Sequence, residues 1–288
     1  MGKKKASYFK NPKKSSQINI PPKGSRGILV TCDVDGSRKA LDQVTRLINE
    51  LADPIEESPE DEQQNEQPIE QQTEKPTEQA QESTDDNPDS NNSKNENKNR
   101  KPRARFVPYM SEVNGNFFIR FTNEKDDPFI IVEKYFNTLK ETGVSLTRNA
   151  TRMYPIQASG FPTSEETIPV LEPFVRNFFR ADGPPISYEI IIQRKHKGSA
   201  SGESHDDLNK KLLALVGPPH HASFHKGDAA VLWISLGRNL YVSVVPKWRE
   251  WCGCNIPKCA AQKFIEKVEE KVEKKEDEKK EDTPAETA

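Results

Sequence analysis

Three of the four cysteines lie close together in the sequence, at Cys252, Cys254 and Cys259. Their thiolates could bind zinc if a nearby histidine supplied a fourth ligand. The candidate histidines are His220, His221 and His225. Structural zinc sites normally pair two short ligand knuckles, and this C-x-C-x4-C spacing has no clear second pair. We therefore expect free thiols and no bound metal, and a chain with so few cysteines indicates a reducing compartment.

Basic and aromatic side chains suited to nucleic acid lie in two distant segments. Arg148 and Arg152 belong to one segment, and Lys247 and Arg249 belong to the other, where they alternate with two tryptophans, Trp248 and Trp251. Guanidinium groups clasp phosphate in a fork, and an indole offers a face on which a base can stack. RNA binding at these segments is one interpretation; the alternative is that the tryptophans pack in the core.

No motif for catalysis or cofactor binding is recognisable. The sequence has no G-x-G-x-x-G after a strand, no G-x-x-x-x-G-K-[ST], no H-E-x-x-H and no G-x-S-x-G. We therefore expect no nucleotide or methyl-donor site and no cofactor. It also has no apolar run near the roughly 18 residues of a membrane span, so we expect no membrane partner.

Charge is segregated along the chain. The net charge is only −2, although 31% of residues are charged and the mean hydropathy is −0.87. The first 26 residues contain lysine and arginine but no acidic residue, whereas 54–105 is rich in Glu, Gln, Asn and Pro. Such segments cannot bury enough apolar surface to offset their ordering entropy. We expect a disordered basic arm at 1–25, a disordered insert at 54–105 and a charged tail at 258–288.

The first ordered block, residues 26–145 outside the insert, predicts two β-α units. The β-rich runs 27–32 and 116–121 are each followed by a helical pattern of apolar residues. Ser37 is the expected N-cap of the first helix. Asp127 is the expected N-cap of the second, with Gly143 as its C-cap.

The second block, residues 146–257, predicts the order α-β-α-β-β. The expected elements are a helix at 168–180, a strand at 187–193, a helix from Ser204 to Gly217, and strands at 229–236 and 240–245. Pro169 and Pro173 favour a late start or a kink in the first of these helices. Two small modules of this kind predict an α/β fold.

Several segments, taken together and in order, resemble eukaryotic THUMP-domain proteins, specifically the adaptors that partner the tRNA cytidine acetyltransferase. These segments are Arg26 to Cys32, Phe117 to Phe121, Arg148 to Ile156, Tyr241 to Trp251, and Asn255 with Ile256. The resemblance spans both ordered blocks. It rests on the combination of segments, since no single motif is diagnostic.

This resemblance implies an N-terminal ferredoxin-like module at 26–145 and a THUMP domain at 146–257. It implies a non-catalytic tRNA-binding adaptor that presents tRNA to a separate RNA cytidine acetyltransferase. The product would be N4-acetylcytidine in the D-arm of serine and leucine tRNAs, made in the nucleus or nucleolus, with the cytoplasm as a second location. The implied RNA contacts are Arg148, Arg152, Pro155, Lys247, Arg249 and Asn255.

Two alternatives stay open at this point. The chain could serve another RNA modification, such as methylation or thiolation. It could also be a nuclear interaction protein whose charged tails act without direct RNA contact by the folded part.

Overall fold

The computed structural model describes residues 20–54, 104–195 and 204–262. The described residues outside Asp53–Ala104 form one compact unit. Most of the predicted basic arm, the insert and the charged tail lie outside the described residues. Within the described part, no helix has the length and apolar character needed to cross a membrane.

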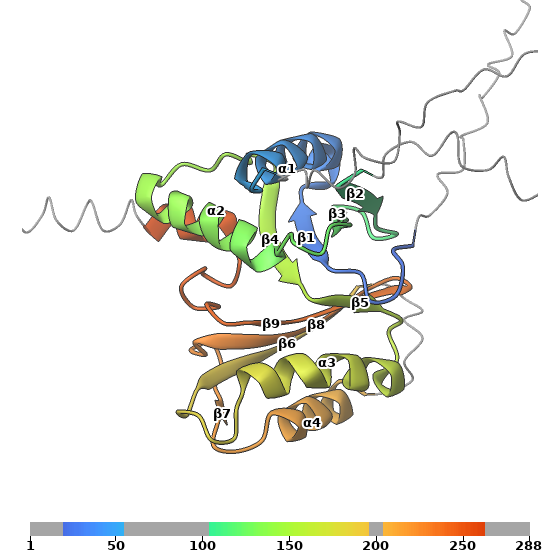
Figure 1. The fold of residues 1–288 in the computed structure, drawn as a ribbon, viewed down its shortest axis with the longest axis vertical. Coiled ribbons are helices and arrows are strands. Elements are labelled where there is room, and N and C mark those ends of the chain that lie inside the picture. Colours follow the sequence, from blue (N-terminus) through green and yellow to red (C-terminus); the bar gives the residue numbers. More distant parts are fainter. Residues whose placement is uncertain (1–19, 55–103, 196–203, 263–288) are drawn as a thin grey trace, which may run out of the picture. The chain divides into compact units, whose positions relative to one another are not determined.

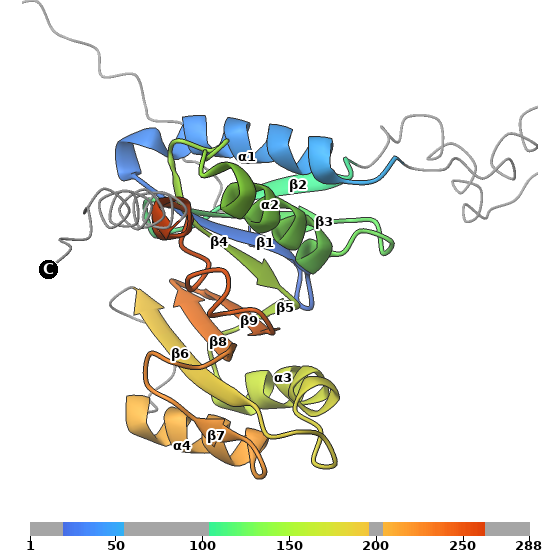
Figure 2. The same cartoon turned by 90° about the vertical axis from the view of Figure 1, so that its left-hand side faces the viewer.

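The first sheet has four antiparallel strands in the order β2-β3-β1-β4 (Figure 1). Their bounds are β1 Gly27–Cys32, β2 Phe106–Met110, β3 Asn116–Phe121 and β4 Ala150–Ile156. Helices α1 (Ser37–Leu51) and α2 (Pro128–Thr142) cover one face of this sheet (Figure 2). Strand β4 lies after residue 146, where the sequence predicted the second domain to begin, yet it pairs with β1 and completes the first sheet. Strand β2, which pairs with β3, was not predicted.

Local signals set the ends of α2 as predicted. The Asp127 side chain accepts a hydrogen bond from the Phe129 N–H, and Gly143 closes the helix in the left-handed conformation at φ 71°. The expected cap of α1 is wrong. Ser37 is its first helical residue, and the Ser37 hydroxyl donates back to the carbonyl of Val34 at 2.9 Å, at the end of the short 3-10 turn Val34–Gly36.

The second sheet has five strands in the order β5-β9-β8-β6-β7. Their bounds are β5 Ala158–Gly160, β6 Ser187–Lys195, β7 His221–Ala222, β8 Ala229–Leu236 and β9 Asn239–Val245. Helices α3 (Ser164–Phe178) and α4 (His205–Val216) lie on one face of it (Figures 1 and 2). The predicted order α-β-α-β-β is present, with β5 and β7 in addition, and the fold is α/β.

Helix α3 starts earlier than its prolines indicated. Both Pro169 and Pro173 lie inside it, although each removes one backbone donor. Two acidic residues in its first turn, Glu165 and Glu166, favour a start at Ser164 by complementing the helix dipole.

Strands β8 and β9 form the shared wall between the two halves of the core. Alternate residues of β8 belong to different clusters: Leu232 packs with the first sheet, and Trp233 packs with α3 and α4. Phe118 of β3 contacts Tyr241 of β9 at 4.9 Å between ring centroids. Burial on both faces explains why β8 is apolar at every position except Ser235.

Candidate functional site

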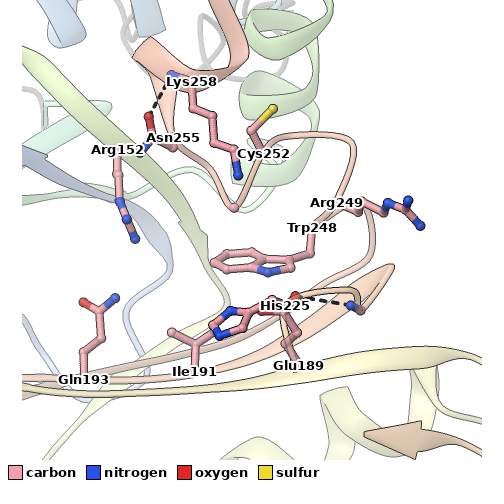
Figure 3. A pocket seen from close by; sticks show the side chains of 12 residues that line it. Arg152, Glu189, Ile191, Gln193, His225, Trp248, Arg249, Cys252, Asn255 and Lys258 are labelled. Atoms are coloured by element: carbon pink, nitrogen blue, oxygen red, sulfur yellow. Dashed lines mark hydrogen bonds between the residues drawn. The ribbon is translucent and has the colours of Figure 1, made fainter. Parts of the chain in front are cut away.

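A cavity of about 380 Å³ lies where β4, β6 and the segments on either side of β8 and β9 meet (Figure 3). We call it the Arg152 cavity. Its lining residues are Arg152, Glu189, Ile191, Gln193, His225, Gly227, Trp248, Arg249, Cys252, Gly253, Asn255 and Lys258. This volume falls within the range typical of small-ligand pockets.

On the β4 side, a shared hydroxyl orients two polar side chains. Arg152 Nη1 donates to the Tyr154 hydroxyl at 3.0 Å, and Gln193 Nε2 donates to the same oxygen at 3.4 Å. Arg152 and Tyr154 are two residues apart on a strand, so their side chains lie on the same face of the sheet. The Arg152 and Gln193 side chains point toward one another (Figure 3). Burial raises the pKa of Tyr154, which keeps it a neutral partner.

The roof of the cavity is the segment after β9, which is tied to β4 by backbone contacts. Arg152 and Asn255 form an isolated antiparallel bridge, and the Met153 N–H donates to the Cys254 carbonyl at 3.2 Å. The Asn255 Oδ1 accepts from the Lys258 N–H at 2.9 Å at the start of helical residues 256–262. These contacts place Asn255 next to the first half of β4.

Both tryptophans of this segment are core residues, as the alternative interpretation held. Trp248 is 6% exposed and stacks on Tyr154 at 6.4 Å, and Trp251 is 2% exposed and stacks on Phe136 at 5.7 Å. Neither indole presents a free face to a base. Trp248 instead forms an apolar wall of the Arg152 cavity.

The cavity is predominantly cationic. Arg152, Arg249 and Lys258 line it together with His225, and Glu189 is the single carboxylate among its lining residues. Within the described part of the chain Arg152 forms no ion pair, whereas Arg249 lies 3.8 Å from an Asp228 carboxylate. Glu189 is engaged as well, because its Oε1 accepts from the Gly227 N–H at 3.2 Å. Such a site can hold an anion through its cations and a polar edge through the amides of Gln193 and Asn255.

The predicted contact residues divide into those at the cavity and those elsewhere. Arg152, Arg249 and Asn255 line the cavity although about a hundred positions separate the first from the other two. Arg249 extends away from Arg152 toward the rim (Figure 3). Arg148 is exposed in the turn before β4 and is not one of the described residues that line the cavity. Pro155 is buried in β4 opposite Ile28 of β1, so its side chain is closed to a ligand.

Lys247 belongs to a different surface. It lines a groove of about 280 Å³ between α2 and α3, which we call the Lys247 groove. The walls of this groove include Phe129, Phe174, Phe178 and Trp251. The Lys247 ammonium pairs with the Glu133 carboxylate, and this hydrogen bond raises the pKa of Lys247. The lysine is thus charged but locally neutralised.

The clustered cysteines are buried free thiols. Within the described residues, no group of three or more His, Cys, Asp or Glu side chains is arranged to hold a metal ion. His220 is turned toward the Arg180 carbonyl at 3.1 Å, while His225 lines the Arg152 cavity. Burial raises the pKa of Cys259 to about 12 and raises that of Cys254 still further, so neither thiol is activated as a nucleophile.

Sequence reasoning missed Gln193 and Lys258, and it named His225 only as a possible zinc ligand and not as part of an RNA site. Gln193 lies on β6, and its amide meets the Tyr154 hydroxyl that Arg152 also binds only because the two sheets pack together. His225 lies in the loop after β7, a strand that was itself unpredicted. Lys258 has a local signal, since it follows Asn255 by one helical turn.

No protein-family model and no curated protein matches this sequence. Among solved structures, the 4-thiouridine synthetase crystallised with RNA and bound ATP is 8% identical over 77% of this chain, with a TM-score of 0.36. The protein PH1313 from Pyrococcus horikoshii Ot3 is 11% identical over 46% of this chain, with a TM-score of 0.32. In each case the match spans 42% of the other chain. Similarity at this level assigns no function to the present chain.

Proposed function

We propose that this protein is an RNA-binding adaptor for tRNA modification that presents tRNA to a separate acetyltransferase for N4-acetylcytidine formation. The observation that carries the proposal is the pairing of Arg152 with Asn255. Both were expected to contact RNA, and they meet on a bridge that lines a mainly cationic cavity. The specific modification, serine and leucine tRNAs as its targets, and a nuclear or nucleolar location rest on the sequence resemblance.

The chemistry of the cavity suits RNA. Arg152, Arg249 and Lys258 offer donors for phosphate oxygens, contacts that set the position and register of a nucleic acid. The amides of Gln193 and Asn255 carry both donors and acceptors, as reading a base or ribose edge requires.

An adaptor of this kind contributes position and no reacting group. Its binding energy would hold the tRNA so that the target cytidine meets the active site of the partner, which converts a bimolecular encounter into an oriented one. The raised pKa values of the buried cysteines and tyrosines agree with that division of labour, because none of these groups is poised for proton transfer near neutral pH.

Direct binding is the first test. The full chain is titrated with a tRNA transcript at several salt concentrations, beside Arg152→Ala and the control Arg176→Ala. Arg176 is paired with Glu172 on α3. We expect Arg152→Ala to weaken binding and to flatten the salt dependence, and Arg176→Ala to match the wild type. Wild-type affinity no greater than that of an unrelated acidic protein would overturn RNA binding and favour the interaction-protein alternative.

The cellular test addresses the modification. N4-acetylcytidine is measured in tRNA from cells that lack this protein, with rescue by the wild type, Arg152→Ala or Arg176→Ala. We expect the mark to vanish, and only the wild type and Arg176→Ala to restore it. Persistence of the mark together with loss of a methylated or thiolated nucleoside would instead support the other RNA-modification alternative.

A further inference from the structure

Phe224 is displayed to solvent beside the Arg152 cavity. Its side chain is 90% exposed, the highest value for a large hydrophobic residue in the described part of the chain. It immediately precedes His225, whose side chain lines the cavity. Consecutive Cα atoms are about 3.8 Å apart, so the Phe224 backbone lies directly next to a lining residue of the cavity. A single exposed apolar residue is ordinary by itself, so what distinguishes Phe224 is how its loop is held and which residues surround it.

The loop that carries Phe224 is fixed at both ends to β6. The Ser223 N–H donates to the Tyr188 carbonyl at 2.8 Å, and the Asp228 N–H donates to the Ser187 carbonyl at 2.9 Å. Gly227 packs so closely on the same strand that an added Cβ would lie 2.6 Å from the Glu189 nitrogen. The exposed phenyl ring is thus presented by a short, anchored loop.

The surroundings of this loop are basic. Lys226 and His225 follow Phe224 in sequence, and His225 holds a left-handed backbone at φ 63°. The Arg249 backbone N–H donates to the Asp228 carbonyl of the same loop at 3.3 Å, and the Arg249 guanidinium lies 3.8 Å from the Asp228 carboxylate. An aromatic face between a cationic cavity and flanking cations is the combination used for unpaired nucleotides, where cations follow the backbone and bases stack on rings.

We propose that Phe224 is a stacking platform for an unpaired RNA base at the rim of the Arg152 cavity, next to a nucleotide whose phosphate the cavity holds. This inference rests on the proposed RNA-binding function and adds a contact to it. A paired base is covered by its own stack, so the platform selects unpaired RNA.

The test compares Phe224→Ala and Phe224→Tyr with the control Phe161→Ala, a phenylalanine that is 49% exposed and lines a different pocket. The probes are a tRNA transcript, a short oligoadenylate and a fully paired RNA duplex. We expect Phe224→Ala to weaken tRNA and oligoadenylate binding about fivefold or more, with an unchanged salt slope because no charge is lost. Phe224→Tyr and Phe161→Ala should bind as the wild type does, and all variants should bind the duplex alike.

Phe224→Trp supplies a second readout. The natural tryptophans Trp233, Trp248 and Trp251 are 0%, 6% and 2% exposed. The indole introduced at position 224 would therefore be much more exposed to solvent than any of them. Stacking on oligoadenylate should quench it and protect it from acrylamide, whereas the duplex should do neither. Wild-type tRNA binding that depends on Arg152 but is unchanged in Phe224→Ala, with no quenching, overturns the platform alone. If the wild type itself does not bind tRNA, the proposed function is overturned as well.

Discussion

The segment that follows β9 separates two surfaces that differ in what their cations can do. On one side, Arg152 lies in a cavity where its described partner is a tyrosine hydroxyl. On the other side, Lys247 lies in an apolar groove and is paired with Glu133. In the sequence these two residues carry the same charge and were predicted to share one role. Of these two residues, Lys247 has a carboxylate partner and Arg152 has none among the residues that the structure describes.

The comparison shows that a basic residue predicts an anion site only once its partners are known. Lys247 has a raised pKa, yet the same contact that raises it cancels its field. Arg152 keeps its charge available in a confined space, where water screens it less than at the open surface. Trp248 and Trp251, one on each side, keep the two surfaces apart.

The largest expected effect comes from removing one of the two tryptophans that separate the surfaces. Trp251→Ala should lower the free energy of unfolding by about 3–5 kcal/mol, because it removes a buried indole stacked on Phe136. Trp248→Ala should lower the free energy of unfolding by nearly as much, since that ring stacks on Tyr154. Urea denaturation of the full chain measures both, with the half-exposed Phe161→Ala as control. A loss below about 1 kcal/mol for either tryptophan would place that ring on the surface and break the comparison.

A second change tests the turn at Gly253, which packs against the Trp248 ring. Gly253 has φ 69°, and an added Cβ would lie 3.2 Å from the Trp248 ring. Gly253→Ala should therefore cost about 1–2 kcal/mol of stability, through the left-handed backbone and the close approach. The matched control is Gly160→Ala, where no heavy atom lies within 4 Å of the added carbon. Equal urea midpoints for the two variants would show that the turn at Gly253 yields without cost.

The third prediction separates the two cations directly. Arg152→Ala should weaken tRNA binding about tenfold and reduce the salt slope by about one, because one phosphate contact is lost. Lys247→Ala should change affinity by less than about twofold, since its charge is already neutralised. Titrations at several salt concentrations measure both effects. If the two variants lose similar amounts of tRNA affinity, Lys247 contacts RNA as Arg152 does, and the division between cavity and groove is wrong.

Local signals predicted both ends of α2 but not the start of α1 or of α3, and long-range pairing decided how the strands assemble. Asp127 and Gly143 act within one or two turns of their own helix, so their roles could be seen in the sequence. Strand β4 joins the first sheet through pairs such as Thr31 with Arg152, and such pairing has no local signature. The same limit applies to the site. Gln193 meets the Tyr154 hydroxyl only through packing of the two sheets, and the exposure of Phe224 depends on where its loop is anchored.

The smallest expected effect comes from removing the neutralising partner in the groove. Glu133→Gln keeps a hydrogen-bond acceptor for Lys247 but removes the negative charge, and Lys247 is 41% exposed. RNA affinity should then rise about twofold at low salt and return to the wild-type value as salt screens the freed ammonium. Glu172→Gln, which frees Arg176 on α3, is the matched control and should leave affinity unchanged.

The double variant Glu133→Gln with Lys247→Ala shows whether the gain in RNA affinity comes from the freed lysine or from the change in net charge. If the gain belongs to the freed lysine, the double variant loses it and binds as Lys247→Ala does. If the gain persists, it reflects only the lower net negative charge of the chain. A gain specific to Lys247 would mean that bound RNA passes over the groove as well as the cavity, and that Glu133 alone keeps the two surfaces unequal.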